Sequence, residues 1–296
     1  MAKNGFQIID SEPHFMEPLE LWIEKLPEPF RSRTNVIQAN NNGLLEGRGA
    51  RLEVDGVEKP PIDPNPMVQQ RSARRVPAVP LLAKVNENPV PDVFLEGFDV
   101  EGIDVGVFMP TAAMRIVRYD GMDPEHSLAL CQVYNDYAAE FCRSYPDRFK
   151  FWAWVPPHDA KLAAGEARRA VEELGAVAVA MTGGAVNGNL LCDEFFDPLW
   201  EEMNRLGTAF GMHGPPANYN LKDNYNHRYR GHRGMGLVGN AMTGPVHAQT
   251  QLAELIIGGV LERFPNLKPV FMEVNASWLP WFLWRLDDKW ETNRPD

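Results

Sequence analysis

The sequence predicts an α/β protein built around a parallel sheet. Short apolar runs alternate with amphipathic helical patterns along the chain, which is typical of repeated βα units. Proline or glycine pairs end several of the apolar runs, as expected at the ends of strands. With 296 residues, 44% of them hydrophobic, the chain can form two ordinary domains or one large α/β barrel.

Six segments are predicted to be strands, because each is a short apolar run bounded by turn-forming residues. They cover residues 6–9, 105–109, 149–155, 176–181, 209–212 and 269–274. Pro110 ends the second segment, Pro156-Pro157 the third and Gly183-Gly184 the fourth. The order of strands and helices therefore favours a sheet of six parallel strands.

Helices are predicted over residues 124–143, 160–174, 197–206 and 249–264. Asp123 precedes a proline at the first helical position, and Asp159 can cap the next helix. Gly207 follows the end of the third helix, where a left-handed residue is common. Gly258-Gly259 interrupts the last helix, which lowers its helix propensity and indicates close packing there.

A long segment, residues 16–98, does not fit a simple βα crossover between the first two strands. Eight prolines lie between Pro60 and Pro91, so this part forms neither a central helix nor a central strand. Loops of this length in compact proteins are usually functional or disordered. We interpret residues 16–98 as an inserted, partly irregular lid or oligomer arm.

Charge and cysteine content exclude several classes of protein. The 29 basic and 40 acidic residues give a net charge of −11, which opposes general binding to nucleic acid or anionic membranes. No apolar run reaches the roughly 20 residues of a membrane span, and the N-terminus lacks a signal-peptide pattern. Cys131, Cys142 and Cys192 form no CxxC pair, which favours free thiols in a reducing cytoplasm.

Two strand ends carry residues suited to a divalent metal. Glu12 and His14 follow the first strand, and their spacing of two places both side chains on one side. His213 follows the fifth strand. Active sites of parallel barrels lie at the carboxyl ends of the strands. A carboxylate and two imidazoles there predict a site for Zn²⁺ or Mn²⁺, although each residue alone is also compatible with a loop position.

Further motifs are distributed along nearly the whole chain. They are Ile9–His14, Glu17-Pro18, Trp22, Leu26-Pro27, Phe30-Arg31, Tyr134–Asp136, Phe141, Pro146–Phe149, Gly211–His213, Gly259–Lys268, Glu273–Pro280 and Arg285–Asp287. Their order and spacing resemble the amidohydrolase-2 family of the amidohydrolase superfamily, the relatives of aminocarboxymuconate-semialdehyde decarboxylase. The run Gly259–Lys268 is the most specific of these motifs.

The resemblance implies a single TIM-barrel-like (β/α)₈ domain over residues 1–296 with one divalent metal ion. The implied ligands are Glu12, His14, His213 and an Asp at the end of the eighth strand. A glutamate at the first ligand position is common among the non-oxidative decarboxylases of the family, whereas hydrolases, lactonases and hydratases share the same fold. The fold alone therefore does not decide the reaction.

The chain departs from the family pattern in two places. Glu273 stands near the position where many members have a proton-transferring histidine, so it is interpreted either as that acid or base or as a packing residue. About six of the eight βα units are present, and Asp287 and Asp288 lie on the helix after the sixth strand. The chain is thus a truncated piece, or a partner supplies the remaining strands, or the barrel is completed in another way.

Cationic residues near the strand ends are candidates for binding a carboxylated substrate. Arg115 and Arg118 follow the second strand, and His227 and Arg230 lie between the fifth and sixth strands. They form either a cationic rim, because arginine pairs with carboxylates through two hydrogen bonds, or a solvated basic surface. His247 opens the last helix and is a second candidate for proton transfer.

Other histidines and tryptophans have simpler interpretations. His126 and His158 are predicted to be surface residues near the starts of helices. Aromatic residues usually fill cores and interfaces. Core or subunit contacts are accordingly predicted for the tryptophans, notably Trp278, Trp281, Trp284 and Trp290.

The preferred hypothesis is a metal-dependent enzyme, or its larger subunit, that decarboxylates a small aromatic or unsaturated acid without oxidation. The first alternative is hydrolysis of an amide, lactone or C–C bond on the same metal centre. The second is a non-catalytic subunit that stabilises a complete homologue. A homo-oligomer, or a hetero-oligomer with a chain that supplies the missing strands, is expected, because an open sheet leaves two edges unpaired.

Overall fold

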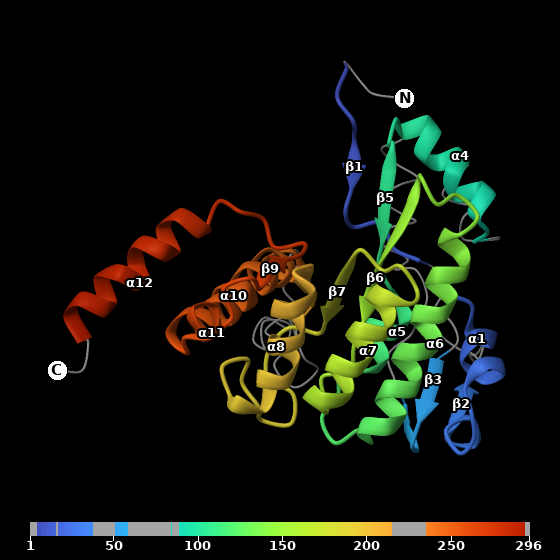
Figure 1. The fold of residues 1–296 in the computed structure, drawn as a ribbon, viewed down its shortest axis with the longest axis horizontal. Helices are drawn as coiled ribbons and strands as arrows, with labels where there is room; N and C mark the ends of the chain where they lie inside the picture. The colour runs from blue at the N-terminus through green and yellow to red at the C-terminus, as the bar shows by residue number, and fades with distance from the viewer. Residues whose placement is uncertain are drawn as a thin grey trace.

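The computed structural model describes residues 5–15, 17–37, 51–58, 84, 89–214 and 235–293, with the backbone alone at 19 and 51 and over 235–240. Its main feature is a sheet of six parallel strands in the order β1-β5-β6-β7-β8-β9. The strands are β1 (Ile9–Asp10), β5 (Val105–Phe108), β6 (Phe149–Trp154), β7 (Ala178–Met181), β8 (Ala209–Met212) and β9 (Lys268–Phe271). The sheet curls into half of a barrel (Figure 1), so the prediction of a parallel α/β sheet with six strands is confirmed.

Helices follow the strands and cover the outer face of the sheet (Figure 1). They include α6 (Pro124–Cys142), α7 (Ala160–Glu172), α8 (Asp197–Leu206), α10 (Met235–Ile257) and α11 (Val260–Arg263). The carboxylate of Asp159 accepts hydrogen bonds from the amides of Lys161 and Leu162, and Gly207 ends α8 with a φ of 63°. Among the residues that the structure describes, none of the helices combines the length and the apolar character needed to cross a bilayer.

The last predicted helix differs from the observed one. The observed helix α10 begins earlier than predicted, at Met235. The helical run is interrupted at Gly258-Gly259, where Gly259 has a φ of 68°. A side chain at Gly258 would collide with the β-carbon of Cys192, so the predicted close packing is confirmed. The glycine pair both breaks the helix and lets it approach the loop after β7.

The core lies between the sheet and helices α6 to α8. Phe108, Phe149 and Trp154 on the strands are almost completely buried, and Phe15, just after β1, stacks on Phe108 with ring centroids 4.6 Å apart. This contact draws the chain after β1 toward the end of β5. The core therefore positions the two strand ends that carry the first predicted site residues.

Part of the predicted insertion, residues 16–98, is ordered secondary structure. It contains α1 (Leu19–Lys25), the 3₁₀ helix η1 (Arg31–Arg33), α4 (Pro91–Glu101) and an antiparallel sheet of β2 (Thr34–Ile37), β3 (Arg51–Val54) and β4 (Val57–Glu58). Most of the proline-rich part, 59–83 and 85–88, lies outside the described residues. Its role as a lid or oligomer arm stays a prediction.

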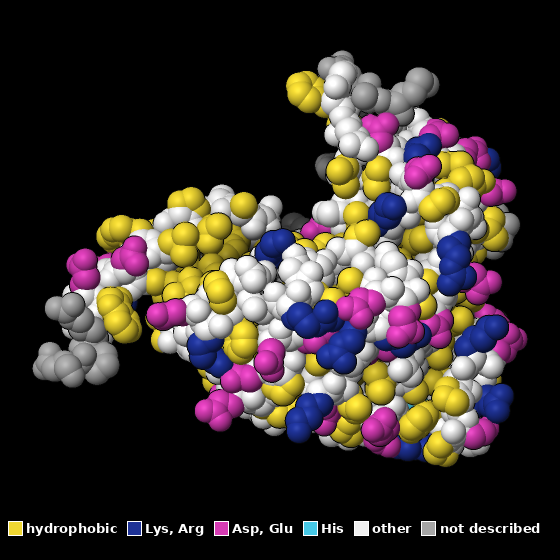
Figure 2. All heavy atoms as spheres, viewed as in Figure 1, with side chains coloured by type: hydrophobic (Ala, Val, Ile, Leu, Met, Phe, Trp, Pro, Cys, Tyr) yellow, Lys and Arg dark blue, Asp and Glu magenta, His cyan; other side chains and the backbone are white. Residues whose placement is uncertain are grey.

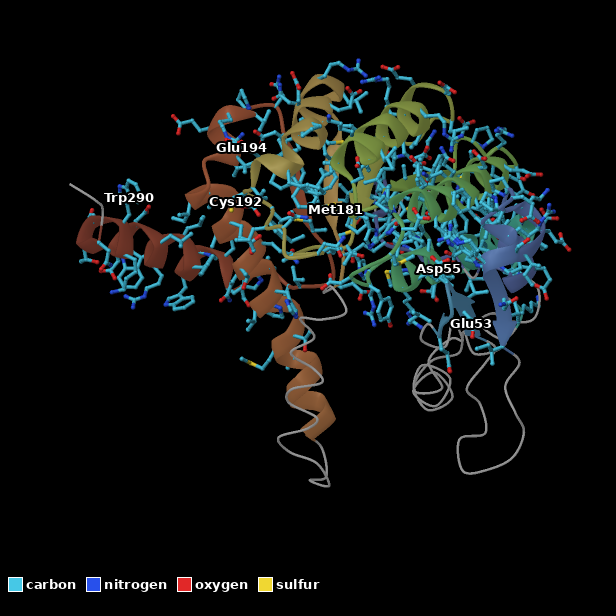
Figure 3. The ribbon with its side chains drawn as sticks, turned by 90° about the horizontal axis from the view of Figure 1, so that it is seen from below. Glu53, Asp55, Met181, Cys192, Glu194 and Trp290 are labelled. Atoms are coloured by element: carbon cyan, nitrogen blue, oxygen red, sulfur yellow. The ribbon has the colours of Figure 1, made fainter. Side chains whose placement is uncertain are left out.

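The prediction that His126 and His158 lie on the surface was wrong. His126 is fully buried. Its Nε2 lies 3.0 Å from Oγ1 of Thr34, and its Nδ1 lies 3.1 Å from a carboxylate oxygen of Asp55, a residue that Figure 3 labels. His158 is buried against Ser127 and a backbone carbonyl. In both histidines, each ring nitrogen has a hydrogen-bond partner, so burying the ring leaves no polar atom unpaired. These partners are distant in the sequence or depend on the fold, so no local pattern predicts them.

Helix α12 (Leu279–Asn293) follows β9 and extends away from the body of the molecule (Figure 1). Trp281, Trp284 and Trp290 on this helix are 55%, 61% and 56% exposed, and hydrophobic side chains gather over this region in Figure 2. The prediction of core positions was therefore wrong for these three. Their role in subunit contacts stays a prediction.

Candidate metal centre

His14 lies where the chain leaves β1 and pairs with the end of β5. The amide of Phe15 donates to the carbonyl of Met109 at 2.8 Å, and His14 itself forms a bridge with Met109. Nδ1 of His14 lies 2.9 Å from the carbonyl oxygen of Pro110. Because a carbonyl only accepts, Nδ1 carries the proton and Nε2 offers its lone pair, as in metal-binding histidines held by a backbone carbonyl.

Glu17 fixes the neighbouring loop and was missed as a site residue by sequence reasoning. Its buried carboxylate accepts hydrogen bonds of 2.9–3.2 Å from the amides of Thr111, Ala112 and Ala113, which open the short helix α5 (Ala112–Ile116). Burial raises the pKa of Glu17, and these amides oppose the rise. The only sequence signal for this residue was the Glu17-Pro18 pair in the family motif.

His213 follows β8 directly and is 7% exposed. Its amide donates to the carbonyl of Met181 at the end of β7. Figure 3 labels Met181. Both ring nitrogens are buried without a hydrogen-bond partner among the described residues. Burial, and to a smaller extent the proximity of His14 and Arg115, lowers the pKa of His213 to about 3. The ring is therefore neutral and offers a free lone pair, which a metal ligand requires.

Glu273 follows β9 and faces both imidazoles. Nε2 of His14 lies 3.9 Å from Oε1 of Glu273, and Nε2 of His213 lies 3.8 Å from Oε2. The ring centroids of the two histidines are 5.2 Å apart. One ligand atom from each residue of this His14–His213–Glu273 cluster lies within 4.8 Å of the other two, a spacing that could hold a metal ion.

Glu12, the predicted partner of His14, is not a member of this cluster. Burial raises the pKa of its carboxyl group. The backbone amide of Glu273 opposes that rise by a hydrogen bond, and the negative charge of the Glu273 side chain adds to it. Glu12 is thus next to Glu273, and of the predicted metal ligands the structure brings His14 and His213 together.

A cavity of about 420 Å³ opens beside the cluster. Among its lining residues are His213 and Glu273 from the cluster, together with Arg115, Arg118 and His247. Burial lowers the pKa of Arg115, and the neighbouring Arg118 lowers it further. A desolvated cation on the cavity wall favours an anionic ligand.

The remaining predicted residues divide into two groups. His247 on α10 is buried, and burial lowers its pKa, so it faces the cavity as a neutral ring. His227 and Arg230 lie outside the described residues. The structure thus brings four predicted substrate-binding or catalytic residues, Arg115, Arg118, His247 and Glu273, to one cavity.

A curled parallel sheet with two imidazoles and a carboxylate at the carboxyl ends of its strands defines a barrel-type protein with a candidate metal centre. The chain belongs to the amidohydrolase-2 family, because the family's sequence profile, described as Amidohydrolase, matches residues 60–292. The resemblance inferred from the sequence motifs is confirmed.

Individual relatives agree with this assignment. Gamma-resorcylate decarboxylase of Rhizobium sp. (strain MTP-10005) is 26% identical over 206 residues, which cover 68% of this chain and 60% of that protein. Matches to the curated relatives span about half to three fifths of their length, from 47% to 60%.

Solved structures have the same fold. Amidohydrolase map2389c of Mycobacterium avium subsp. paratuberculosis K-10 superimposes with a TM-score of 0.72 at 20% identity, over 97% of this chain and 78% of that one. The 5-carboxyvanillate decarboxylase of Novosphingobium aromaticivorans DSM 12444 was solved with manganese and 4-hydroxy-3-methoxy-5-nitrobenzoic acid. It superimposes with a TM-score of 0.58 at 20% identity, over 99% of this chain and 73% of that one. The expected amidohydrolase barrel fold is confirmed, with six strands in the part of the sheet that the structure describes.

Proposed function

We propose that this chain is a metal-dependent enzyme, or its larger subunit, that removes the carboxylate of a small aromatic or unsaturated acid as CO₂ without oxidation. The observation that carries this proposal is the His14–His213–Glu273 cluster beside a cavity that is also lined by the half-buried guanidinium group of Arg115. The similarity to gamma-resorcylate and 5-carboxyvanillate decarboxylases supports decarboxylation over hydrolysis.

The residues fit a divalent cation, either Zn²⁺ or Mn²⁺. His14 and His213 each offer one nitrogen ligand, and an ion would give a partner to one ring nitrogen of His213, whose burial without a partner costs about 1–3 kcal/mol. Glu12 was predicted as the carboxylate ligand beside them. When bound, the ion would act as a Lewis acid on substrate oxygens.

Arg115 and Arg118 would bind the substrate carboxylate. Arg115 is desolvated on the cavity wall, and Nε of Arg118 is buried without a hydrogen-bond partner among the described residues. A carboxylate between the two guanidinium groups would receive charge-assisted hydrogen bonds and reduce their mutual repulsion. His227 and Arg230 are proposed to extend this cationic rim.

His247 would transfer the proton that replaces CO₂ on the substrate carbon. Loss of CO₂ leaves the bonding electron pair on that carbon, which must take up one proton. A neutral imidazole has one N–H and one lone pair, so His247 can pass a proton from a substrate hydroxyl group or water to the carbon. Glu273 is the second candidate for this step, because its carboxylate also lines the cavity.

Decarboxylation can be tested with the purified chain loaded with Mn²⁺ or Zn²⁺. We expect CO₂ release from gamma-resorcylate, 5-carboxyvanillate or a related acid, with one deuterium incorporated per product molecule in D₂O. Arg115→Gln should raise KM for the acid at least tenfold and change kcat less, because it removes ground-state binding of the carboxylate.

The matched control for Arg115→Gln is Arg143→Gln, which changes an exposed arginine at the end of α6. It should leave KM unchanged. Hydrolysis of amide or lactone substrates without CO₂ release would show instead that the site is a hydrolase. Absence of both reactions in a chain that binds metal would favour the non-catalytic subunit.

We further propose that the enzyme works as a homo-oligomer, or with a chain that supplies further barrel strands. Strands β1 and β9 are the edges of the six-stranded sheet, and the tryptophans of α12 are exposed. Open edges and apolar patches favour association. A cytoplasmic location is proposed as well, supported by three cysteines that are all free.

A further inference from the structure

We infer that Gln251 determines substrate specificity. Its side-chain amide hydrogen-bonds a neutral oxygen substituent, such as a ring hydroxyl group, of the acid that occupies the cavity. This inference rests on the proposed function and adds a second recognition group to the arginines that would bind the carboxylate. It defines the substrate as an acid with an uncharged hydrogen-bonding group in addition to the carboxylate that is lost.

Gln251 is a buried polar side chain of α10 that lines the cavity. It is 5% exposed, and its amide makes no hydrogen bond with any residue that the structure describes. A primary amide has two N–H donors and a carbonyl acceptor, and burying them without partners is unfavourable. Buried polar groups in proteins almost always have partners, so a ligand in the cavity is the expected partner of this amide.

Gly183 makes room for the Gln251 amide beside the end of β7. A β-carbon at Gly183 would collide with Nε2, Cδ and Oε1 of Gln251. The φ of Gly183 is not in the left-handed region, so the backbone conformation does not require glycine there. Glycine at this position therefore provides space for the amide, which lies against the backbone two residues after β7.

The amide and the arginines reach the cavity from different strand ends. Arg115 lies on α5 and Arg118 just after it, so both follow β5, whereas Gln251 lies against the backbone after β7. Strand β6 separates β5 from β7 in the sheet. Neighbouring strands are about 4.8 Å apart, which places β5 and β7 about 10 Å from each other. A small acid whose carboxylate binds the arginines would therefore present another part of its ring to Gln251.

The surroundings of Gln251 favour an uncharged group on that part of the ring. His247, one helical turn before Gln251 on the same face of α10, is a neutral ring because burial lowers its pKa. Among the described residues that line the cavity, the cationic side chains are those of Arg115 and Arg118. A second carboxylate beside Gln251 would be desolvated without a cation, whereas a hydroxyl group can both donate to and accept from the amide.

Binding of simple aromatic acids tests this inference. The Mn²⁺-loaded chain is titrated by calorimetry with benzoate and with its ortho-, meta- and para-hydroxy derivatives. We expect at least one hydroxy acid to bind at least tenfold more tightly than benzoate, because it alone provides a partner for the buried amide.

Two variants remove the amide from the cavity wall in different ways. Gln251→Met keeps the length of the side chain but removes the amide, so it should reduce the tenfold preference to less than threefold. Gly183→Ala should do the same, because its β-carbon displaces the amide of an unchanged Gln251. The matched control is Gln249→Met, which changes a half-buried glutamine of α10 that does not line the cavity and should keep the preference.

The ratio of affinities separates recognition from a structural role. Circular dichroism establishes that each variant is folded, and a variant that only loosens the site weakens all the acids alike. The inference is overturned if Gln251→Met keeps every preference of the unmodified chain. It is equally overturned if the unmodified chain binds no hydroxy acid more tightly than benzoate.

Measurement of CO₂ release distinguishes this inference from the proposed function. Release of CO₂ from a hydroxy acid, with the preference unchanged in Gln251→Met, contradicts the inference alone. Binding with the expected preference but without CO₂ release from any hydroxy acid contradicts decarboxylation and supports the role of Gln251. A chain that binds none of the acids contradicts both.

Discussion

A single buried carboxylate, that of Glu17, joins two loops of the candidate site. It comes from the segment after β1 and accepts hydrogen bonds from three successive amides at the start of α5. The same segment carries His14, and α5 carries Arg115. One residue thus sets the relative position of a proposed metal ligand and a proposed substrate-binding arginine.

The first prediction concerns this contact. Glu17→Gln exchanges one acceptor oxygen for an NH₂ group that faces backbone N–H donors. We expect the free energy of unfolding to fall by about 2 kcal/mol, because buried donors lose a charged acceptor. Urea unfolding of the two proteins measures this change.

The control variant is Glu20→Gln, which changes an exposed carboxylate on the adjacent helix α1. It should change stability by no more than about 0.5 kcal/mol. Equal effects of the two substitutions would show that Glu17 does not hold the loops together.

At the scale of elements, helices α7 and α8 are joined by an ion-pair network. The Glu202 carboxylate is 6% exposed and accepts two hydrogen bonds from the Arg168 guanidinium, at 3.0 and 2.8 Å. Arg205, on the same helix as Glu202, donates two further hydrogen bonds to this carboxylate. The hydrogen bonds from Arg168 hold the pKa of Glu202 down, at about 2, so this pair of helices depends on an ionised carboxylate.

This shift predicts how stability depends on pH. Glu202 has a folded pKa below its ordinary value of 4.5, so its contribution is complete above pH 4.5 and is lost as the pH falls toward 2. Glu202→Gln should lower the free energy of unfolding by roughly 1–2 kcal/mol at pH 7. The difference in free energy of unfolding between Glu202→Gln and the unmodified chain should shrink as the pH falls from 4.5 to 2.

Thermal melting from pH 2 to 7 follows this difference, and Glu201→Gln, at the exposed neighbouring position, is the matched control. A gap between Glu202→Gln and the unmodified chain that stays constant across the whole range would contradict the assigned ion pair. The helix packing would then depend on apolar contacts alone.

At the scale of the whole molecule, the described parallel sheet forms half of a barrel. The parallel sheet ends at β1 and β9, and α12 exposes large aromatic side chains beyond β9 (Figures 1 and 2). Parallel sheets are normally covered on both faces, and exposed tryptophans are typical of interfaces. These features are the basis of the proposed assembly.

The double variant Trp281→Ser/Trp284→Ser tests that proposal. Native mass spectrometry of the unmodified protein should show a mass above the 33.4 kDa of one chain. The variant should raise the dissociation constant about 30-fold or more, as expected when aromatic anchors worth at least about 2 kcal/mol are removed. Val177→Ser, which changes an exposed apolar residue elsewhere on the surface, should leave the dissociation constant unchanged. A single-chain mass at all concentrations would rule out the assembly.

Local sequence signals were sufficient for most of the elements. Asp159 and Gly207 mark their helix ends because capping depends on side chains within a few residues. The strands follow from short apolar runs, and the parallel order follows from the alternation with helices. His14 and His213 could be proposed as site residues because barrel strands place their carboxyl ends at one face.

The sequence by itself therefore determined the strands, the helix ends and the face that carries the site, since each depends on short-range chemistry or on a general rule of parallel sheets. Tertiary structure alone decided that Glu273 rather than Glu12 faces both histidines, that Glu17 anchors α5 and that His126 is buried. The partners of Glu17 are about 95 residues away in the chain. Contacts over such separations depend on how the whole sheet curls, and no local pattern encodes that curvature.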